Sequence, residues 1–206
     1  VGMKASGTLA HSPSALRGKG LLEFLDAETR SDEYLFKNRK FNSDVLAFRV
    51  RADSTREWGF GMENANGIVD FDKEKGDFNL NDPGSYFSFP DNKYICYMDY
   101  ARWLIPDKAV NVEKRQGDAS ALMVSVHPHQ DSLQFVAGRT KFYLEQSLLE
   151  SFEVPNIEVA DASIFPDTGY VAIDANANMR TLNNATITAN RTDKFHEFYG
   201  GIIDIK

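Results

Sequence analysis

Apolar and polar residues alternate with a period of two along most of this chain. The stretches "GLLEFLDA" from Gly20, "DVLAFRVRA" from Asp44, "GDFNLND" from Gly76 and "TGYVAIDA" from Thr168 show the pattern. Successive side chains of a β-strand point to opposite faces, so this alternation indicates strands with one buried face. We therefore expect an all-β, mostly antiparallel protein.

Short segments rich in Asp, Asn, Gly and Pro separate these stretches. They are "DPGS" at 82–85, "PDNK" at 90–93, "IPDK" at 105–108 and "FPDT" at 165–168. Pro, Asp and Gly each favour the backbone angles of tight turns. Turn signals at this spacing predict many short strands in one all-β domain.

Two segments depart from simple alternation. Residues 141–153, "KFYLEQSLLESFE", contain enough Leu and Glu for a helix. The even-numbered spacing of their apolar positions favours a strand instead, with one face formed by Phe142, Leu144, Leu148, Phe152 and Val154. Residues 92–106, "NKYICYMDYARWLIP", are apolar on both faces and predict a strand buried on both sides, in the middle of a sandwich or a wide sheet.

Several segments repeat one plan. "DFDKEKGDFNL" (70–80), "LIPDKAVNV" (104–112) and "IFPDTGYVAI" (164–173) each read as an apolar strand, an Asp-bearing turn and an alternating strand. "DAETRSDEYLF" (26–36) and "NATITANRTDKF" (184–195) form a second pair. Self-similarity is typical of stacked units that bury their faces against neighbours. We predict degenerate repeats, with chance similarity of composition as the alternative.

The plan of "ADASIFPDTGYVAIDANANM" resembles the OstA-like modules of envelope transport proteins in Gram-negative bacteria. The resemblance covers residues 95–112 and 159–189. It implies antiparallel strands stacked into an open β-jelly roll whose interior carries lipid chains. A short β-solenoid-like stack is the other architecture that the repeats allow.

Most of the chain, including "SGTLAHSPSALRGKGLLEF" and "NMRTLNNATITAN", also resembles segments of large, uncharacterised, repeat-bearing envelope or surface proteins of Gram-negative bacteria. This resemblance implies an extracytoplasmic location (periplasm, outer membrane or cell surface) and neighbouring modules of the same protein as partners. Strand-like patterns reach both termini. We therefore expect residues 1–206 to be a single elongated β-rich domain cut from a longer chain.

The composition of the chain argues against several classes of binding partner and site. The 206 residues include 23 Lys and Arg against 30 Asp and Glu, a formal net charge of −7. This balance argues against nucleic acid, which requires a basic surface. No stretch approaches the roughly 20 apolar residues of a membrane-spanning helix. Cys96 is the only cysteine, which excludes an intrachain disulfide and a cysteine-based zinc site.

Asp167 lies in Asp-Thr-Gly, the tripeptide that carries the catalytic carboxylate of pepsin-like proteases. Those enzymes need two such carboxylates about 3 Å apart to share a proton. This chain has one Asp-Thr-Gly, and Pro166 precedes it. A homodimer supplying the second carboxylate remains the catalytic alternative. We interpret Asp167 as a turn residue.

Two further groups suggest metal ligands. His127 and His129 in "VHPHQD" lie at the spacing of paired zinc ligands, with Asp131 as a third, and a polar strand end closed by Pro128 is the structural alternative. "DFDKEKGDFNLND", from Asp70, copies the first alternation of an EF-hand loop but has Lys where Gly is required and Asn in place of the final Glu. We interpret it as a hairpin turn.

Trp58 is a candidate for ligand contact. It precedes Gly59 and Gly61, and glycine lets a ligand approach the backbone, so the ring suits stacking against a sugar unless it belongs to the core. We predict no catalytic residue, cofactor or metal, and hence no enzyme. The expected role is a non-catalytic structural scaffold. A module that binds lipid or glycan is the alternative, with Trp58, His127 and His129 as candidate contacts.

Overall fold

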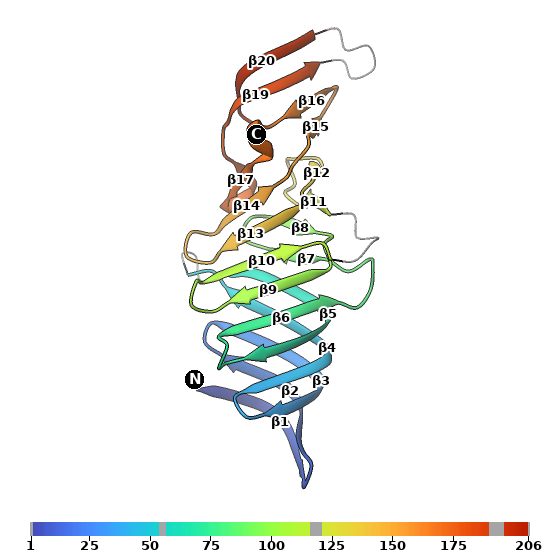
Figure 1. Cartoon of the computed structure of the whole chain (residues 1–206), viewed down its shortest axis with the longest axis vertical. Coiled ribbons are helices and arrows are strands. Elements are labelled where there is room, and N and C mark those ends of the chain that lie inside the picture. The colour runs from blue at the N-terminus through green and yellow to red at the C-terminus, as the bar shows by residue number, and fades with distance from the viewer. Residues whose placement is uncertain (1, 54–56, 116–120, 190–195, 206) are drawn as a thin grey trace.

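A computed structural model of the chain describes residues 2–53, 57–115, 121–189 and 196–205. The described part consists mainly of antiparallel strands with two short 3-10 helices, so the all-β prediction is confirmed. The chain progresses along the long axis, with the N-terminal strands at one end and the C-terminal hairpin at the other (Figure 1).

The strands up to residue 113 are β1 (Met3–Ser12), β2 (Ala15–Phe24), β3 (Ala27–Lys37), β4 (Lys40–Arg51), β5 (Trp58–Asp70), β6 (Lys75–Leu80), β7 (Phe87–Phe89), β8 (Tyr94–Cys96), β9 (Tyr100–Leu104) and β10 (Ala109–Glu113). The remaining strands are β11 (Leu122–Ser125), β12 (Gln134–Val136), β13 (Arg139–Tyr143), β14 (Leu148–Phe152), β15 (Ile157–Val159), β16 (Ala162–Phe165), β17 (Val171–Asp174), β18 (Asn178–Met179), β19 (Leu182–Ala189) and β20 (His196–Ile203). The 3-10 helices are η1 (Asp167–Gly169) and η2 (Ala175–Ala177).

The sheet divides at β5. Strands β1 to β5 form consecutive antiparallel hairpins, and β5 pairs with β4 along one side. On its other side, β5 pairs with β7 through Gly61 and Met62, and with β6 through Ala65–Asp70. One long strand thus starts two arms of the sheet.

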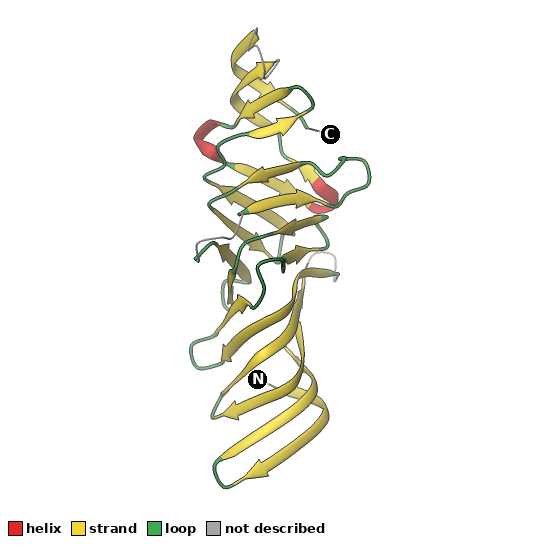
Figure 2. Cartoon of the chain, turned by 90° about the vertical axis from the view of Figure 1, so that its right-hand side faces the viewer, coloured by secondary structure: helices red, strands yellow, loops and turns green. Residues whose placement is uncertain are grey.

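Hairpins then alternate between the two arms. The first arm has the order β6-β9-β10-β13-β14-β17-β18. The second arm has the order β7-β8-β11-β12-β15-β16-β19-β20. Each new hairpin pairs with the previous hairpin of its own arm, and this alternation extends the molecule along its axis (Figure 2).

The core lies between the arms. Phe89 of β7 and Phe142 of β13 are fully buried and contact each other edge-to-face, with 5.5 Å between ring centroids. The Thr140 hydroxyl lies 3.7 Å from the sulfur of Met123 across the same interface. Because alternate residues of most strands face inward, the period-two pattern of the sequence becomes one continuous apolar interior.

Residues 92–106 do not form the single strand predicted from their apolar faces. Strand β8 belongs to the second arm and β9 to the first, and residues 97–99 cross between them. Met98 is 1 % exposed within this crossover. The segment is apolar throughout because it passes through the core between the arms, and not because a central strand is covered on both faces.

Residues 141–153 form a hairpin of β13 and β14, so the preference for strand over helix is confirmed. The predicted face is wrong for Leu148 and Phe152 in β14, whereas Val154 after that strand is buried as predicted. Leu149 and Ser151 are buried, whereas Leu148 and Phe152 are only partly buried. Ser147 has a φ of 50°, and this left-handed residue reverses the facing of the positions that follow.

Two of the three segments with a shared sequence plan each contain a hairpin turn, and the third does not. Residues 70–80 contain the turn from β5 to β6, the first strand of the first arm. Residues 104–112 contain the turn from β9 to β10 within that arm. Residues 164–173 instead lead from β16 of the second arm through η1 to β17 of the first. In the second pair, residues 190–195 lie outside the described residues.

Both ends of the described sheet present open edges. Strand β1 pairs only with β2, and β20 pairs only with β19, among the residues that the structure describes. All ten residues of β1 are exposed. Within the described ranges, no helix has the length and apolar character needed to cross a membrane.

Candidate ligand-binding groove

Four adjacent strands place one row of side chains on the outer face of the sheet. Glu28 of β3 is in register with Arg49 of β4, Arg49 with Gly61 of β5, and Gly61 with Ser88 of β7. Gly61 has no side chain, and a Cβ built there would lie 3.2 Å from the Ser88 hydroxyl oxygen. The row therefore changes from the long side chains of Glu28 and Arg49 to the small residues Gly61 and Ser88, which leaves a hollow over the small residues.

Trp58 closes one side of this hollow. The guanidinium carbons of Arg49 and Arg51 lie 4.1 and 3.9 Å from the centroid of its ring. These distances are within the range of favourable cation–π contact. Arg49 Nε also donates to Glu28 Oε1 at 2.5 Å. Trp58 and Glu28 thus hold the Arg49 side chain in one position.

The loop from β6 to β7 closes the opposite side. Tyr86 is 46 % exposed, and its ring contacts Tyr97 edge-to-face with 5.8 Å between centroids. The resulting groove has a volume of about 700 Å³. Its lining includes Ala47, Gly61, Trp58 and Tyr86. This volume lies within the range of about 300–1,000 Å³ typical of small-molecule sites.

A second groove of about 810 Å³ continues along the same face and shares Arg30, Ala47 and Glu63 with the first. Buried serines support its walls. The hydroxyls of Ser31 and Ser43 lie 2.9 Å apart, and both donate to the carbonyl oxygen of Val45, at 2.7 and 2.9 Å.

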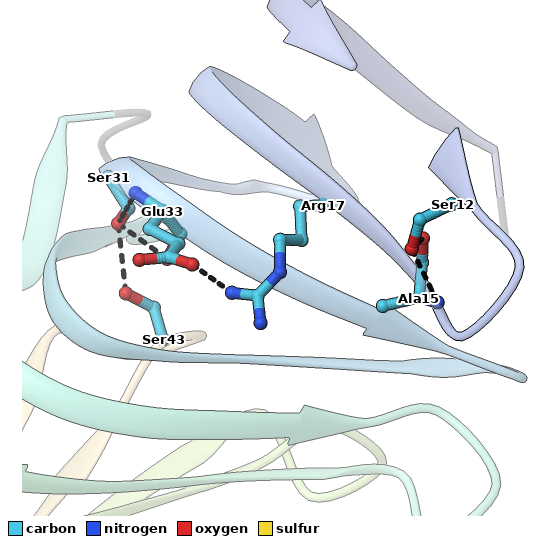
Figure 3. A network of polar contacts seen from close by, with 6 residues as sticks. All are labelled: Ser12, Ala15, Arg17, Ser31, Glu33 and Ser43. Atoms are coloured by element: carbon cyan, nitrogen blue, oxygen red, sulfur yellow. Dashed lines mark hydrogen bonds and ion pairs between the residues drawn. The ribbon is translucent and has the colours of Figure 1, made fainter. Parts of the chain in front are cut away.

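Figure 3 shows that the Ser31 hydroxyl also contacts the backbone of Glu33, whose carboxylate pairs with Arg17. These bonds satisfy backbone groups where β2 and β3 change register, between Gly18 and Gly20. Bulges of this kind bend strands.

Arg30 and Glu63 stand on either side of Ala47 where the two grooves meet. Both side chains are exposed. Neither forms an ion pair or a side-chain hydrogen bond within the described parts of the chain. The charged residues of the first groove are Glu28, Arg30, Arg49 and Glu63, so their formal charges cancel.

The structure places Trp58 at the groove, but one of the two neighbouring glycines has a different role from the one predicted for it. A Cβ at Gly59 would lie 2.8 Å from Cε1 of Phe142 and 3.0 Å from the Cβ of Ala52, so Gly59 makes room for core packing. Only Gly61 faces the groove. The guanidinium groups of Arg49 and Arg51 contact the Trp58 ring. Tyr86, which the sequence analysis did not identify, presents the more exposed aromatic surface.

His127 and His129 lie in the turn that follows β11. Their ring centroids are 5.5 Å apart, and the His129 amide donates to Nδ1 of His127 at 3.3 Å. Asp131 follows in the same turn with a φ of 43°. Among the described residues, no group of three or more His, Cys, Asp or Glu side chains is arranged to hold a metal ion.

Asp167 is exposed in η1, and the prediction that it is a turn residue is confirmed. Pro166 has a φ of −62°, and Thr168 and Gly169 have φ values of 54° and 66°. The Gly169 amide donates to the Pro166 carbonyl at 3.2 Å. The Asp-Thr-Gly tripeptide thus provides the tight connection between the two arms.

Asp70 likewise stabilises a turn. Its Oδ1 accepts hydrogen bonds from the amides of Asp72 and Lys73, both at 3.1 Å, and Asp70 pairs in register with Lys75. The Asp72 carboxylate forms an ion pair with Arg39. The hairpin interpretation of this segment is confirmed.

Comparison of the chain with models of protein families, with curated proteins and with solved structures finds no match.

Proposed function

We propose that the chain is a non-catalytic structural module of an extracytoplasmic envelope or surface protein of a Gram-negative bacterium, where it joins neighbouring β-modules end to end. The observation that carries the proposal is the pair of open edges at opposite ends of the long axis, β1 and β20 (Figure 1). An unpaired edge presents backbone donors and acceptors to which another strand adds.

Exposed apolar side chains accompany both edges. Leu9 of β1 is 62 % exposed, and Phe198, Tyr199 and Ile202 of β20 are 56, 73 and 76 % exposed. In an isolated sheet, such edges favour uncontrolled association, which proteins usually prevent with charges or a cover. Strands supplied by neighbouring modules would cover these residues and complete the ladders.

The alternation of hairpins between two arms supports a stacked architecture, either an open jelly roll or a short solenoid-like stack. Each hairpin contacts the hairpin before it in the same arm, so further units add without rearranging the existing ones. A scaffold of this kind gains length in proportion to its number of hairpins. The resemblance to repeat-bearing envelope proteins is consistent with such a role.

A lipid- or glycan-binding module is the alternative. An apolar cavity lined by Phe36, Phe41 and Phe71 has basic residues at its rim, but its volume is about 200 Å³. Ligand sites typically occupy about 300–1,000 Å³. The buried aromatic rings between the arms also fill space that a lipid chain would need. These observations favour the scaffold over the lipid carrier.

The test joins two copies of the chain in tandem through a short flexible linker. If β20 of the first copy pairs with β1 of the second, amide exchange in those two strands slows about tenfold or more relative to the single chain. The thermal midpoint of the tandem also rises above that of the single chain. Exchange and midpoint identical to those of the single chain would reject end-to-end pairing.

Charged substitutions provide the matched control. Leu9→Lys and Ile202→Lys place charges on the two edges and should abolish the coupling in the tandem. Val45→Lys introduces the same charge at a residue that is 58 % exposed on β4, an internal strand. This control should retain the coupling.

A further inference from the structure

We propose that the groove between Trp58 and Tyr86 binds a saccharide that carries a carboxylate, with Arg30 holding the carboxylate and Tyr86 supporting the sugar ring. The site belongs to the outer face of β3, β4, β5 and β7. It lies away from the open edges β1 and β20, so it does not depend on end-to-end association.

Arg30 is the anchor for the carboxylate. It is an exposed cation in a chain whose formal net charge is −7, and its guanidinium has no ion-pair partner among the described residues. A guanidinium recognises a carboxylate through two parallel N–H donors. A ligand carboxylate therefore gains more binding free energy from Arg30 than from an arginine that already pairs with a carboxylate of the protein.

Arg49 is a second, pre-positioned donor. Its Nε and Nη2 face Glu28, and its guanidinium carbon lies 4.1 Å from the Trp58 centroid. Restricting a long side chain before binding lowers the conformational entropy lost when a ligand arrives. The N–H groups not directed at Glu28 remain for ligand oxygens.

The two carboxylates of the groove limit how much negative charge the ligand carries. Glu63 has no cationic partner within the described residues, and Glu28 already contacts Arg49. A polyphosphate would place several negative charges beside both carboxylates. A sugar with one carboxylate instead offers hydroxyl hydrogens, which the Glu63 carboxylate accepts.

The position of the groove favours a saccharide over a peptide. Extended peptides bind by adding to an exposed sheet edge through their backbone. Strands β3, β4 and β5 are internal, with a neighbouring strand on each side. Recognition here must use side chains and the exposed ring of Tyr86, a combination that suits the hydroxyls and apolar face of a sugar.

The experiment titrates the single chain with neutral trisaccharides in which one residue is replaced by galacturonic, glucuronic or mannuronic acid, so that each carries one carboxylate, up to about 10 mM, and records amide resonances of Arg30, Gly61 and Ser88. At least one acid should shift all three resonances. Its methyl ester, which lacks the charge, should bind about tenfold more weakly or not at all. An acidic tripeptide is the comparison for peptide binding.

Three variants assign the contacts. Arg30→Gln should raise the Kd about tenfold or more, and Tyr86→Ser should raise it several-fold. Lys37→Gln is the matched control, because Lys37 is an exposed cation on the same strand that does not line the groove, and it should leave the Kd within about twofold.

The proposal is overturned if none of the three acids shifts the groove resonances. It is also overturned if the ester binds as well as the acid, if Arg30→Gln behaves like Lys37→Gln, or if the tripeptide binds as tightly as the best trisaccharide.

Discussion

The side-chain amide of Asn92 donates to the carbonyl oxygen of Ser147 at 2.7 Å and thereby ties the β7–β8 turn of the second arm to the β13–β14 turn of the first. The same nitrogen donates to the carbonyl oxygen of Ile173 at 3.0 Å. Asn92 is fully buried. One buried side chain therefore bonds to the backbone of two strands or turns of the first arm.

Removing this amide should destabilise the protein substantially. Asn92→Ala removes two hydrogen bonds from a fully buried position, at a cost of about 2–4 kcal/mol in the free energy of unfolding. Asn92→Asp should cost more, because a buried carboxylate would face two acceptors. Asn66→Ala is the control, since its hydrogen bonds to Asn79 and Asn81 are more accessible to water and should contribute under about 1 kcal/mol. Urea denaturation measures all three, and equal effects of Asn92→Ala and Asn66→Ala would refute the role.

The sequence predicted the strands well because inward positions on most strands carry large apolar residues. It did not predict which strands pair. The chain changes arm at Met98, but the residues there are as apolar as those of the strands on either side, so the sequence pattern does not mark the crossover. At Ser147, a positive φ reverses which positions face the core, and the residue type does not predict that angle. The groove could be predicted only in part. The sequence identified Trp58 from its two neighbouring glycines. Arg30 and Tyr86 line the same groove because of the strand registers, which include bulges between β4 and β5, and the sequence pattern does not show these registers.

The carboxylate of Asp77 makes the free energy of unfolding depend on pH. Burial alone raises its pKa, but hydrogen bonds from Lys75, Tyr100 and Arg102 together lower the pKa to about 2. The Lys75 and Arg102 nitrogens lie 2.8 and 2.7 Å from its oxygens. Because the folded pKa is below the unfolded value of about 3.9, the unfolded state binds the proton more readily.

The stabilisation from Asp77 should therefore be complete above about pH 5 and disappear as the pH falls from about 4 to about 2. We expect Asp77→Asn to lower the free energy of unfolding by about 1–2 kcal/mol at pH 7, after allowance for solvent screening, and by much less at pH 2. Asp32→Asn, at the exposed Lys19–Asp32 pair, should show a smaller pH dependence. Denaturation curves at several pH values test this, and a difference that stays constant down to pH 2 would contradict the assignment.

Gly59 is required by the packing of Phe142. An added Cβ would approach Cε1 of that ring to 2.8 Å, and Ala52 prevents a shift in the other direction because its Cβ would be 3.0 Å away. Gly59→Ala should cost about 1–3 kcal/mol, as overpacked cores do. Gly84→Ala, where nothing lies within 4 Å, should change stability by less than about 0.5 kcal/mol.

A double-mutant cycle identifies the clash as the cause. Phe142→Leu alone should be destabilising, but it should be less so in the Gly59→Ala background, where the smaller side chain relieves the contact. Additive effects of the two substitutions would show that Gly59 acts through something other than Phe142. Thermal or urea denaturation of the four proteins gives the coupling energy.

Cys96 provides a chemical probe for the opening of the second arm. It is fully buried in β8, and burial raises the pKa of its thiol to about 12. Only the thiolate reacts rapidly with disulfide reagents. We expect negligible labelling of the folded protein at pH 8 and immediate labelling once the arm opens. A Cys96→Ser protein carrying Val45→Cys, with its thiol on an exposed position, should react at once in the folded state.

Labelling of Cys96 during urea denaturation then asks whether the two arms unfold together. Trp103 of the first arm is 3 % exposed and lies in the same continuous core as Cys96. In a protein that carries Trp58→Phe, Trp103 is the only tryptophan, so the fluorescence reports the other side of that core. Because rings such as Phe89 and Phe142 pack across the arms, opening one arm exposes apolar surface of the other. The midpoints for labelling and for fluorescence should coincide. Labelling of Cys96 at urea concentrations that leave the fluorescence native would instead show that the arms open separately, as loosely coupled stacks do.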